Sequence, residues 1–559
     1  MEKLLRIFSK ESANINQVAL LLGFFTLLSQ ILALFRDRSI AHFIGPSPAL
    51  DAYYAAFRVP DLVFICIASL ASVTVLVPFI IARMSGEKIS YEARKYLNNV
   101  FTIFFIFMIV VSLIIFFLMP YLVSFVAPGF TPMMQSKLIL LSRIMLLSPI
   151  LMGLSNLFST ITQLFRRFFI YALSPIFYNL GIIIGVIFFY PIFGIYGLAL
   201  GVVLGAFMHF AIQAISSKFC GFKPSFSLSV NFKDIKKVAL TSLPRTLGLA
   251  FNNIALISII ALASFLRSGS ISVFNFAFNL QSVPLNIIGI SYAVAAFPTL
   301  AKSISRNKMD EFKIHLKSAA RAIVFWSLPI IFLFIVVRAQ IVRVILGSGN
   351  FSWEDTRLVA ASLAIFSVSI IAQGMIALLS RSYYAFGDTK RPLIINFSCS
   401  VLIIVLSYMF IHLFENVLLF RYFIESLLKV NDIPGTEVLM LPLAYSIGTI
   451  VNFILHWIFV KKDFMPNESF IAKTFFQSLG ASFFLGLVAY IGLNIFSSIF
   501  GTTTFWGVFL QGFISGILGI MAAILVLYLL KNEELQDITK VLKTKFWRTK
   551  IIAPSPEGF

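Results

Sequence analysis

Long apolar stretches that alternate with short polar segments are the main pattern along this chain. A membrane-spanning helix needs about 20 apolar residues in a row, and we find fourteen stretches of roughly that length or longer. Because backbone polar groups inside a bilayer must bond within their own segment, each stretch is predicted to be a helix. The predicted fold class is therefore an all-α polytopic membrane protein. The predicted spans are residues 15–35, 59–82, 99–127, 137–163, 168–191, 194–216, 238–266, 271–300, 318–342, 357–385, 392–414, 437–460, 473–498 and 504–530.

Two short patterns recur in the two halves of the chain. "VPFIIAR" ends the second span with Pro78, and "FPTLAK" ends the eighth with Pro298. "SPIFYN" in the fifth span and "RPLIIN" in the eleventh each place an asparagine four residues after a proline. These matches predict two six-helix halves repeated in parallel, an architecture in which substrate sites lie between the halves. The alternative is that Pro-x-x-x-Asn recurs by chance in a chain rich in Ile and Phe.

The repeat divides the chain into four predicted parts. Residues 1–220 form the first half with helices 1–6, and residues 221–465 form the second half with helices 7–12. Residues 466–530 hold helices 13 and 14, which stand outside the repeat, and residues 531–559 are a basic cytoplasmic tail.

The composition agrees with a bilayer environment. Hydrophobic residues make up 59% of the chain and charged residues 12%, whereas soluble domains carry about 25% charged residues. The net charge of +21 allows a nucleic-acid-binding interpretation, but Lys and Arg are spread over many short loops. They concentrate in both tails and in the loops after even-numbered spans, which predicts that both termini lie in the cytoplasm. We expect no nucleic-acid partner.

Residues able to hold a metal or a cofactor show no recognisable pattern. Cys66, Cys220 and Cys399 are far apart and lie in or beside apolar stretches, as small buried residues do. The five histidines are scattered, and the chain has no glycine-rich phosphate-binding loop. Such a loop would have indicated nucleotide binding. We therefore expect no metal, no cofactor and no enzymatic activity.

The segment 36–62, "RDRSIAHFIGPSPALDAYYAAFRVPDL", places many charges between the first two spans. It combines Arg-Asp at the end of a helix, a Gly-containing turn, and Asp-Ala followed by two aromatic residues and Ala-Phe-Arg-x-Pro. This arrangement resembles the start of the MurJ (MviN) family of bacterial lipid II flippases, within the MOP superfamily of polysaccharide exporters and multidrug extruders. "LPRTLGLAFNNI" and "SYYAFGDTKRPL" resemble later parts of the same family.

The resemblance implies a fold and an activity. The fold is the fourteen-helix MOP flippase fold, and the activity is transfer of a polyprenyl-pyrophosphate-linked glycan, above all lipid II, across the bacterial cytoplasmic membrane for peptidoglycan synthesis. Alternating access is the implied mechanism. The implied partners are the undecaprenyl-pyrophosphate-type substrate, membrane lipids and cell-wall synthesis proteins. At three positions where the family has arginines in a central cavity, this chain has Gln30, Phe64 and Asn279.

Cations for the pyrophosphate are expected among the arginines near or inside the spans. Arginine suits this role because its planar fork holds phosphate oxygens with two hydrogen bonds. Arg36 and Arg58 lie on the family motif, and Arg245 lies about two turns into the seventh span. The alternative for Arg36 is an interface residue paired with Asp37 or Asp51, and Arg58 has the same alternative of an interface residue. The alternative for Arg245 is a side chain that extends to the cytoplasmic interface.

Amides inside the spans are the second candidate group, because polar residues are costly in lipid. Asn275 and Asn279 are one turn apart and share a helix face; together with Gln30 and Asn253 they are predicted to bind sugar or peptide groups. The alternative is that they join helices to one another. Asp37 and Asp51 are predicted to be structural. Candidates for bending during alternating access are Pro60, Pro284 and Gly289, with fixed structural kinks as the alternative.

Three other functions remain open from the sequence. An exporter of another undecaprenyl-linked polysaccharide unit belongs to the same class. A membrane glycosyltransferase or polymerase requires a catalytic carboxylate, and the outer loop 415–436 offers Glu415, Glu425 and Asp432 without a motif. A multidrug antiporter requires an ionisable carboxylate deep in a span, whereas Asp61 is predicted, like Asp37 and Asp51, to lie near an interface.

Overall fold

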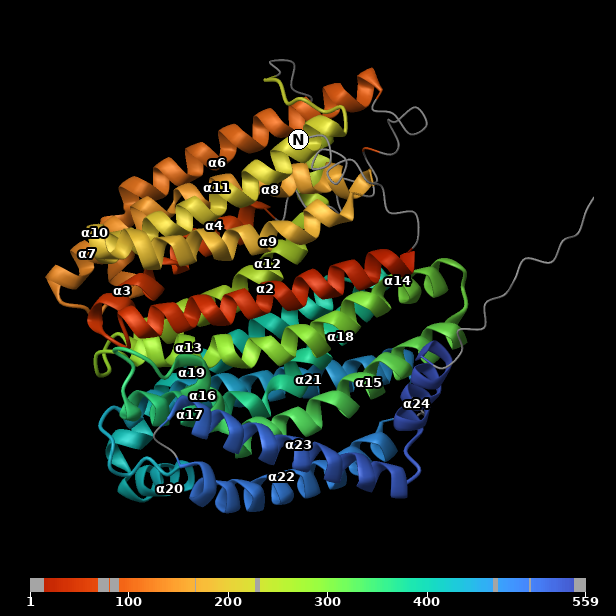
Figure 1. Ribbon diagram of the computed structural model, residues 1–559. Helices are drawn as coiled ribbons and strands as arrows, with labels where there is room; N and C mark the ends of the chain where they lie inside the picture. The colour runs from red at the N-terminus through yellow and green to blue at the C-terminus, as the bar shows by residue number, and fades with distance from the viewer. Residues whose placement is uncertain are drawn as a thin grey trace, which may run out of the picture. The chain divides into compact units, whose positions relative to one another are not determined.

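The computed structural model describes residues 15–68, 80, 90–165, 167–226, 232–465, 471–501 and 504–546, and these residues are helical or lie in turns and short connections, with no strand. The helices are drawn in Figure 1. Their bounds are α2 (Ile15–Phe43), α3 (Pro48–Ala56), α4 (Arg58–Ala68), α6 (Tyr91–Val126), α7 (Pro132–Met145), α8 (Leu147–Leu164), α9 (Phe168–Ile184), η1 (Gly185–Phe189), α10 (Tyr190–Phe193), α11 (Ile195–Phe219), α12 (Phe232–Ala263), α13 (Ser270–Pro284), η2 (Leu285–Ile290), α14 (Ser291–Ser305), α15 (Met309–Val336), α16 (Arg338–Leu346), α17 (Trp353–Val368), α18 (Ile370–Ala385), α19 (Lys390–Asn416), α20 (Leu418–Leu428), η3 (Thr436–Leu439), α21 (Met440–Phe464), α22 (Ala472–Phe500), α23 (Phe505–Leu529) and α24 (Glu533–Phe546).

The apolar helices follow the predicted spans closely. Within the described residues, 11 helices are long and apolar enough to cross a membrane, and the pair α17 and α18, broken at Ser369, raises this to 12. These helices coincide with the third to the fourteenth predicted spans. The predicted first span lies within α2, and the predicted second span begins in α4 and continues beyond the described residues. The all-helical, multi-pass fold class is confirmed, and the count of fourteen stays a prediction.

The chain forms two compact units, which we describe one at a time. The first comprises Met1–Val283, Val342–Ser369 and Gly387–His456, and the second comprises Pro284–Ile341, Ile370–Phe386 and Trp457–Phe559. In the first unit α2 packs on α9, α4 packs on α8, and α12 packs on α19. In the second unit α14 and α15 pack on α18, and α22 packs on both α15 and α23.

Several of these helix pairs correspond under the predicted repeat. The pair α2 and α9 joins the predicted first and fifth helices, and the pair α12 and α19 joins the seventh and eleventh. Likewise, α4 with α8 joins the second and fourth, and α14 with α18 joins the eighth and tenth. Equivalent packing of equivalent helices is what a parallel six-helix repeat requires. The division at residues 220 and 465 itself remains a prediction.

Glycines allow α9 and the adjoining η1 to pack on α11 at very short range in the first unit. A Cβ on Gly201 would lie 2.6 Å from the Gly185 Cα, and a Cβ on Gly181 would lie 2.2 Å from the Gly205 Cα. No side chain other than hydrogen fits at such a contact. This is the small-residue packing that holds membrane helices together where the hydrophobic effect is absent.

The second unit has an apolar core and one similar close contact. Phe325, Ala481, Leu485, Ala523 and Leu527 form a buried cluster among α15, α22 and α23. In η2, a Cβ on Gly289 would lie 2.6 Å from the Cα of the glycine at position 374 in α18. The predicted bending point therefore lies at a close contact between two helices.

Candidate functional site

Asp51 joins the segment between the first two predicted spans to the start of α13. Asp51 is 3% exposed. Its carboxylate accepts hydrogen bonds from the backbone N–H of Gly269 at 2.6 Å and of Ser272 at 2.8 Å. The Ser272 hydroxyl donates a third bond at 2.6 Å. Because the first N–H groups of a helix have no partner within the helix, Asp51 caps α13 from a different part of the chain.

The pKa of Asp51 reflects two opposed effects. Burial raises it from the ordinary value of 3.8 to about 6, and the hydrogen bonds from Ser272 and Gly269 act in the opposite direction. The predicted structural role of Asp51 thus has a specific form: it positions α13.

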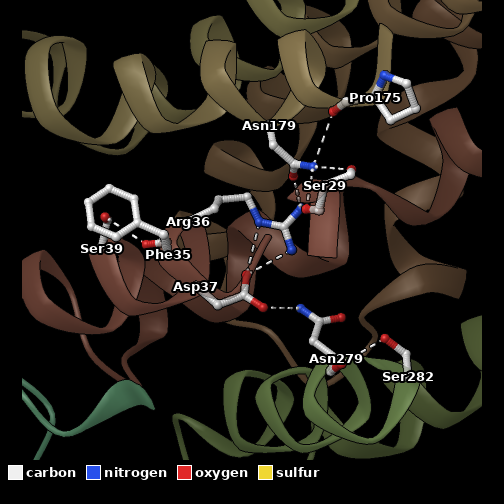
Figure 2. A network of polar contacts seen from close by, with 9 residues as sticks. All are labelled: Ser29, Phe35, Arg36, Asp37, Ser39, Pro175, Asn179, Asn279 and Ser282. Atoms are coloured by element: carbon white, nitrogen blue, oxygen red, sulfur yellow. Dashed lines mark hydrogen bonds and ion pairs between the residues drawn. The ribbon is translucent and has the colours of Figure 1, made fainter. Parts of the chain in front are cut away.

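Arg36 and Asp37 form the centre of a polar network that joins α2, α9 and α13 (Figure 2). The Arg36 guanidinium donates to Asp37 Oδ1 through Nε at 2.9 Å and Nη2 at 2.8 Å, and through Nη1 to Asn179 Oδ1 at 3.1 Å. Asn279 on α13 donates to the other Asp37 oxygen at 3.1 Å. The Arg36 and Asp37 side chains are 20% and 3% exposed, so the ion pair is largely removed from solvent.

Asn179 orients this network from α9. Its amide nitrogen lies 3.2 Å from the Pro175 carbonyl oxygen and 3.3 Å from the Ser29 hydroxyl, which leaves the amide oxygen to accept from Arg36. The sequence marks Pro175-x-x-x-Asn179 as part of the repeat and Asn179 as a polar residue inside a span. Its role as the partner of Arg36 was not predicted, although the in-span amide was visible.

Arg58 is bonded very differently from Arg36. Its Nη2 donates to Asn275 Oδ1 at 2.7 Å, and Asn275 in turn donates to the Ile271 carbonyl oxygen in its own helix. The Arg58 Nε is buried and has no hydrogen-bond partner among the described residues. Within the described residues, the Arg58 hydrogen bond goes to a neutral amide, and no carboxylate contacts this guanidinium directly.

Both networks reach the same face of α13. Asn275 and Asn279 are four residues apart, which corresponds to about 6 Å along a helix. Asn275 meets Arg58, and Asn279 meets the Asp37 carboxylate that holds Arg36. The arrangement therefore brings to adjacent turns of α13 one guanidinium that is bonded to a carboxylate and one that is bonded to a neutral amide. It can receive an anionic group, and both asparagines act here as links between helices.

The other predicted site residues lie apart from this network or outside the described side chains. Gln30 is half-buried on α2, and Asn253 is half-buried on α12. The backbone of Arg245 belongs to α12, but its side chain lies outside the described residues. Pro60 lies in the first turn of α4, where a missing N–H costs no hydrogen bond. Pro284 ends α13 directly before the π-helical η2.

The multi-pass helical fold of this chain is shared with solved structures of membrane proteins. A solved structure titled as an inward-facing multidrug resistance MATE family transporter of the MOP superfamily aligns with a TM-score of 0.62 at 16% identity, covering 80% of this chain and 98% of that one. A second, titled lipid II flippase MurJ in an inward closed conformation, aligns with a TM-score of 0.73 at 22% identity, covering 93% and 100%.

The sequence comparisons then identify the family. Residues 40–511 match the family model described as lipid II flippase MurJ, and the chain belongs to that family. The probable lipid II flippase MurJ of Buchnera aphidicola subspecies Schizaphis graminum is 29% identical over 490 residues, 85% of this chain and 90% of that protein. The lipid II flippase MurJ of Burkholderia cenocepacia is 23% identical over 492 residues, 86% and 91% of the two chains. The resemblance found in the sequence is confirmed, and the protein is a transporter and not an enzyme.

Proposed function

We propose that this protein moves lipid II across the bacterial cytoplasmic membrane by alternating access, with Arg58 as the first contact for the pyrophosphate. Membership of the lipid II flippase family supports the substrate class. The observation that carries the choice of Arg58 is its guanidinium, which within the described residues makes one hydrogen bond, to a neutral amide, and has a buried Nε without a partner.

A charge comparison separates the two arginines. A guanidinium has five N–H donors, and Arg36 uses three of them, two on one oxygen of Asp37. An anion would have to compete with this carboxylate for Arg36. Arg58 offers four donors and has no carboxylate bonded to it, so an anion binds there at lower cost, and charged hydrogen bonds to phosphate oxygens are the strong kind.

The Arg36–Asp37 pair has a second, supporting role in the proposal. One N–H on Nη1 and one on Nη2 remain for a ligand after the three bonds to Asp37 and Asn179 are made. Arg36 then contacts an outer phosphate oxygen while Asp37 keeps its orientation. Arg245, Gln30 and Asn253 stay in the proposal as further contacts for the lipid head, and both termini are proposed to lie in the cytoplasm.

A second glycan carrier is the competing candidate within the same class. Gln30, Phe64 and Asn279 stand where the family resemblance implies arginines, and Asn279 is bonded to Asp37. A site with fewer cations favours a head with fewer negative charges. The competing proposal is therefore an exporter of another undecaprenyl-linked polysaccharide unit.

Complementation of a bacterial strain depleted of its own lipid II flippase tests the proposal. The wild-type chain is expected to restore growth, and Arg58→Gln is expected to fail, because glutamine keeps a hydrogen-bond donor but removes the charge. Arg357→Gln is the matched control, because Arg357 is an arginine paired with the exposed Asp432. Failure of the wild-type chain to restore growth, with normal membrane insertion, would favour the other glycan carrier.

A further inference from the structure

A cavity of about 160 Å³ lies within the first unit, among α4, α7, α8, α9 and α11. Most of its lining is apolar, including Phe57, Phe64 and Met152. The lining residues that carry polar side-chain groups are Asp61 on α4, Tyr178 on α9 and Ser148 on α8. Neither Arg58 nor Arg36, Asp37 or Asn179 lines it, and Asp61 lies one helical turn from Arg58.

Asp61 has no hydrogen bond or ion pair from its side chain among the described residues, and it lines this cavity. The Ser148 and Tyr178 hydroxyls bond to each other, and within the described residues neither of them makes a hydrogen bond to the Asp61 carboxylate. Arg58, one turn earlier on the same helix, acts on Asp61 only through its charge, because its Nη2 is bonded to Asn275. An isolated carboxylate in a mostly apolar cavity is costly, and binding a proton or another cation removes that cost.

The ligand that fits this environment is a proton. A metal cation would need several oxygen ligands with enough negative charge, whereas the lining of this cavity offers one carboxylate residue and two neutral hydroxyl residues. The described residues contain no group of three His, Cys, Asp or Glu side chains that could hold a metal. The ionisable groups that interact with Asp61 are Arg58 on α4 and Tyr178 on α9. The lining residues from α7, α8 and α11 carry no ionisable group. The described side chains of α12, from Thr246 to its end, carry no charge.

We propose that Asp61 takes up and releases one proton in each transport cycle and thereby controls the affinity of Arg58 for an anion. The carboxylate oxygen accepts a proton from a hydronium ion in the cavity, and a water molecule leaves. No other bond changes. With Asp61 charged, the Arg58 and Asp61 charges cancel; with Asp61 protonated, Arg58 is uncompensated. Proton binding and anion binding then favour each other, and by linkage the effect is reciprocal.

This inference rests on the proposed function only in assigning the anion to Arg58, so the test has two independent parts. The first uses the full chain in lipid vesicles without any substrate, and follows the infrared absorption of protonated carboxyl groups against pH. We expect a titrating signal in the wild type that is missing from Asp61→Asn. Glu354→Gln, which removes an exposed carboxyl in the first turn of α17, is expected to keep it. Identical titrations in all three proteins would overturn the proposal.

The second part measures binding of inorganic pyrophosphate against pH. Wild type is expected to bind roughly tenfold more tightly at acidic than at alkaline pH, within the range usual for coupled sites, and Asp61→Asn is expected to lose most of that difference. Comparing the two proteins cancels the protonation of pyrophosphate itself. Parallel pH profiles, with binding abolished by Arg58→Gln, would overturn the proton proposal and leave the anion site standing. Absence of pyrophosphate binding in every variant would overturn the anion site, and the infrared titration would still decide the role of Asp61.

Discussion

Replacement of Asp51 by alanine tests how α13, which carries both asparagines of the site, is held in place. The change removes both acceptor oxygens and leaves the N–H groups of Gly269 and Ser272 and the Ser272 hydroxyl without partners. An unsatisfied buried donor costs about 1–3 kcal/mol, and loss of a helix N-cap costs about 1 kcal/mol. Since water can enter the space left by the carboxylate, we expect a loss of about 3 kcal/mol in the free energy of unfolding.

The assay is equilibrium unfolding of the purified protein in detergent, followed by tryptophan fluorescence. Asp51→Asn keeps one acceptor oxygen, so about half the loss is expected. Ser272→Ala removes one of the three donors and is expected to cost about 1 kcal/mol. Glu354→Ala, at an exposed position, serves as the control and should leave the midpoint unchanged. If Asp51→Ala unfolded at the wild-type midpoint, the capping interaction would not be what positions α13.

Three further outcomes follow from the structure. Gly201→Leu is expected to cost more than about 2 kcal/mol of unfolding free energy, because even its Cβ would lie 2.6 Å from the Gly185 Cα. Gly480→Leu is the control, because a Cβ on Gly480 would have nothing within 4 Å. Equal stabilities of the two variants would contradict the close packing. The Asp51 carboxyl has a pKa of about 6 in the native protein, so it binds its proton more tightly there than in the unfolded chain. The free energy of unfolding should therefore fall as pH rises from about 4 to about 6, by up to about 3 kcal/mol. An unchanged slope in Asp51→Asn would refute this assignment. Gly289→Ala is expected to lower both the free energy of unfolding and the rate of lipid II flipping in vesicles, because its Cβ would lie 2.6 Å from the Gly374 Cα. Wild-type values of both quantities would show that the two helices can separate there without cost.

The spans and the family could be predicted because both depend on local sequence. Apolar length gives the helices, and residues 36–62 carry the family motif as a continuous segment. The partners of the site residues could not be predicted in this way, because they lie far away in the chain: Asn179 is 143 residues from Arg36, and Asn279 is 242 residues from Asp37. A single sequence holds no information on such pairs beyond the presence of polar residues in apolar stretches.

Two features had local signals that could have been used. The spacing of glycines four apart in "GIIIG" at 181–185 and in "GLALGVVLG" at 197–205 is the pattern typical of closely packed membrane helices. Asp61 was predicted to lie near an interface, since it lies close to the start of an apolar stretch. The structure places it in a cavity, because helices α7, α8, α9 and α11 surround α4 at that level, which no local pattern shows.

The rate at which Arg58→Gln moves lipid II across vesicle membranes tests the central claim most directly. A hydrogen bond to a charged group contributes about 1.5–3 kcal/mol, which corresponds to a loss of roughly 10- to 100-fold in affinity or rate. We predict a loss of that size in Arg58→Gln, partial recovery in Arg58→Lys, and a wild-type rate in Arg357→Gln. A wild-type flipping rate in Arg58→Gln, at equal amounts of folded protein, would contradict the account.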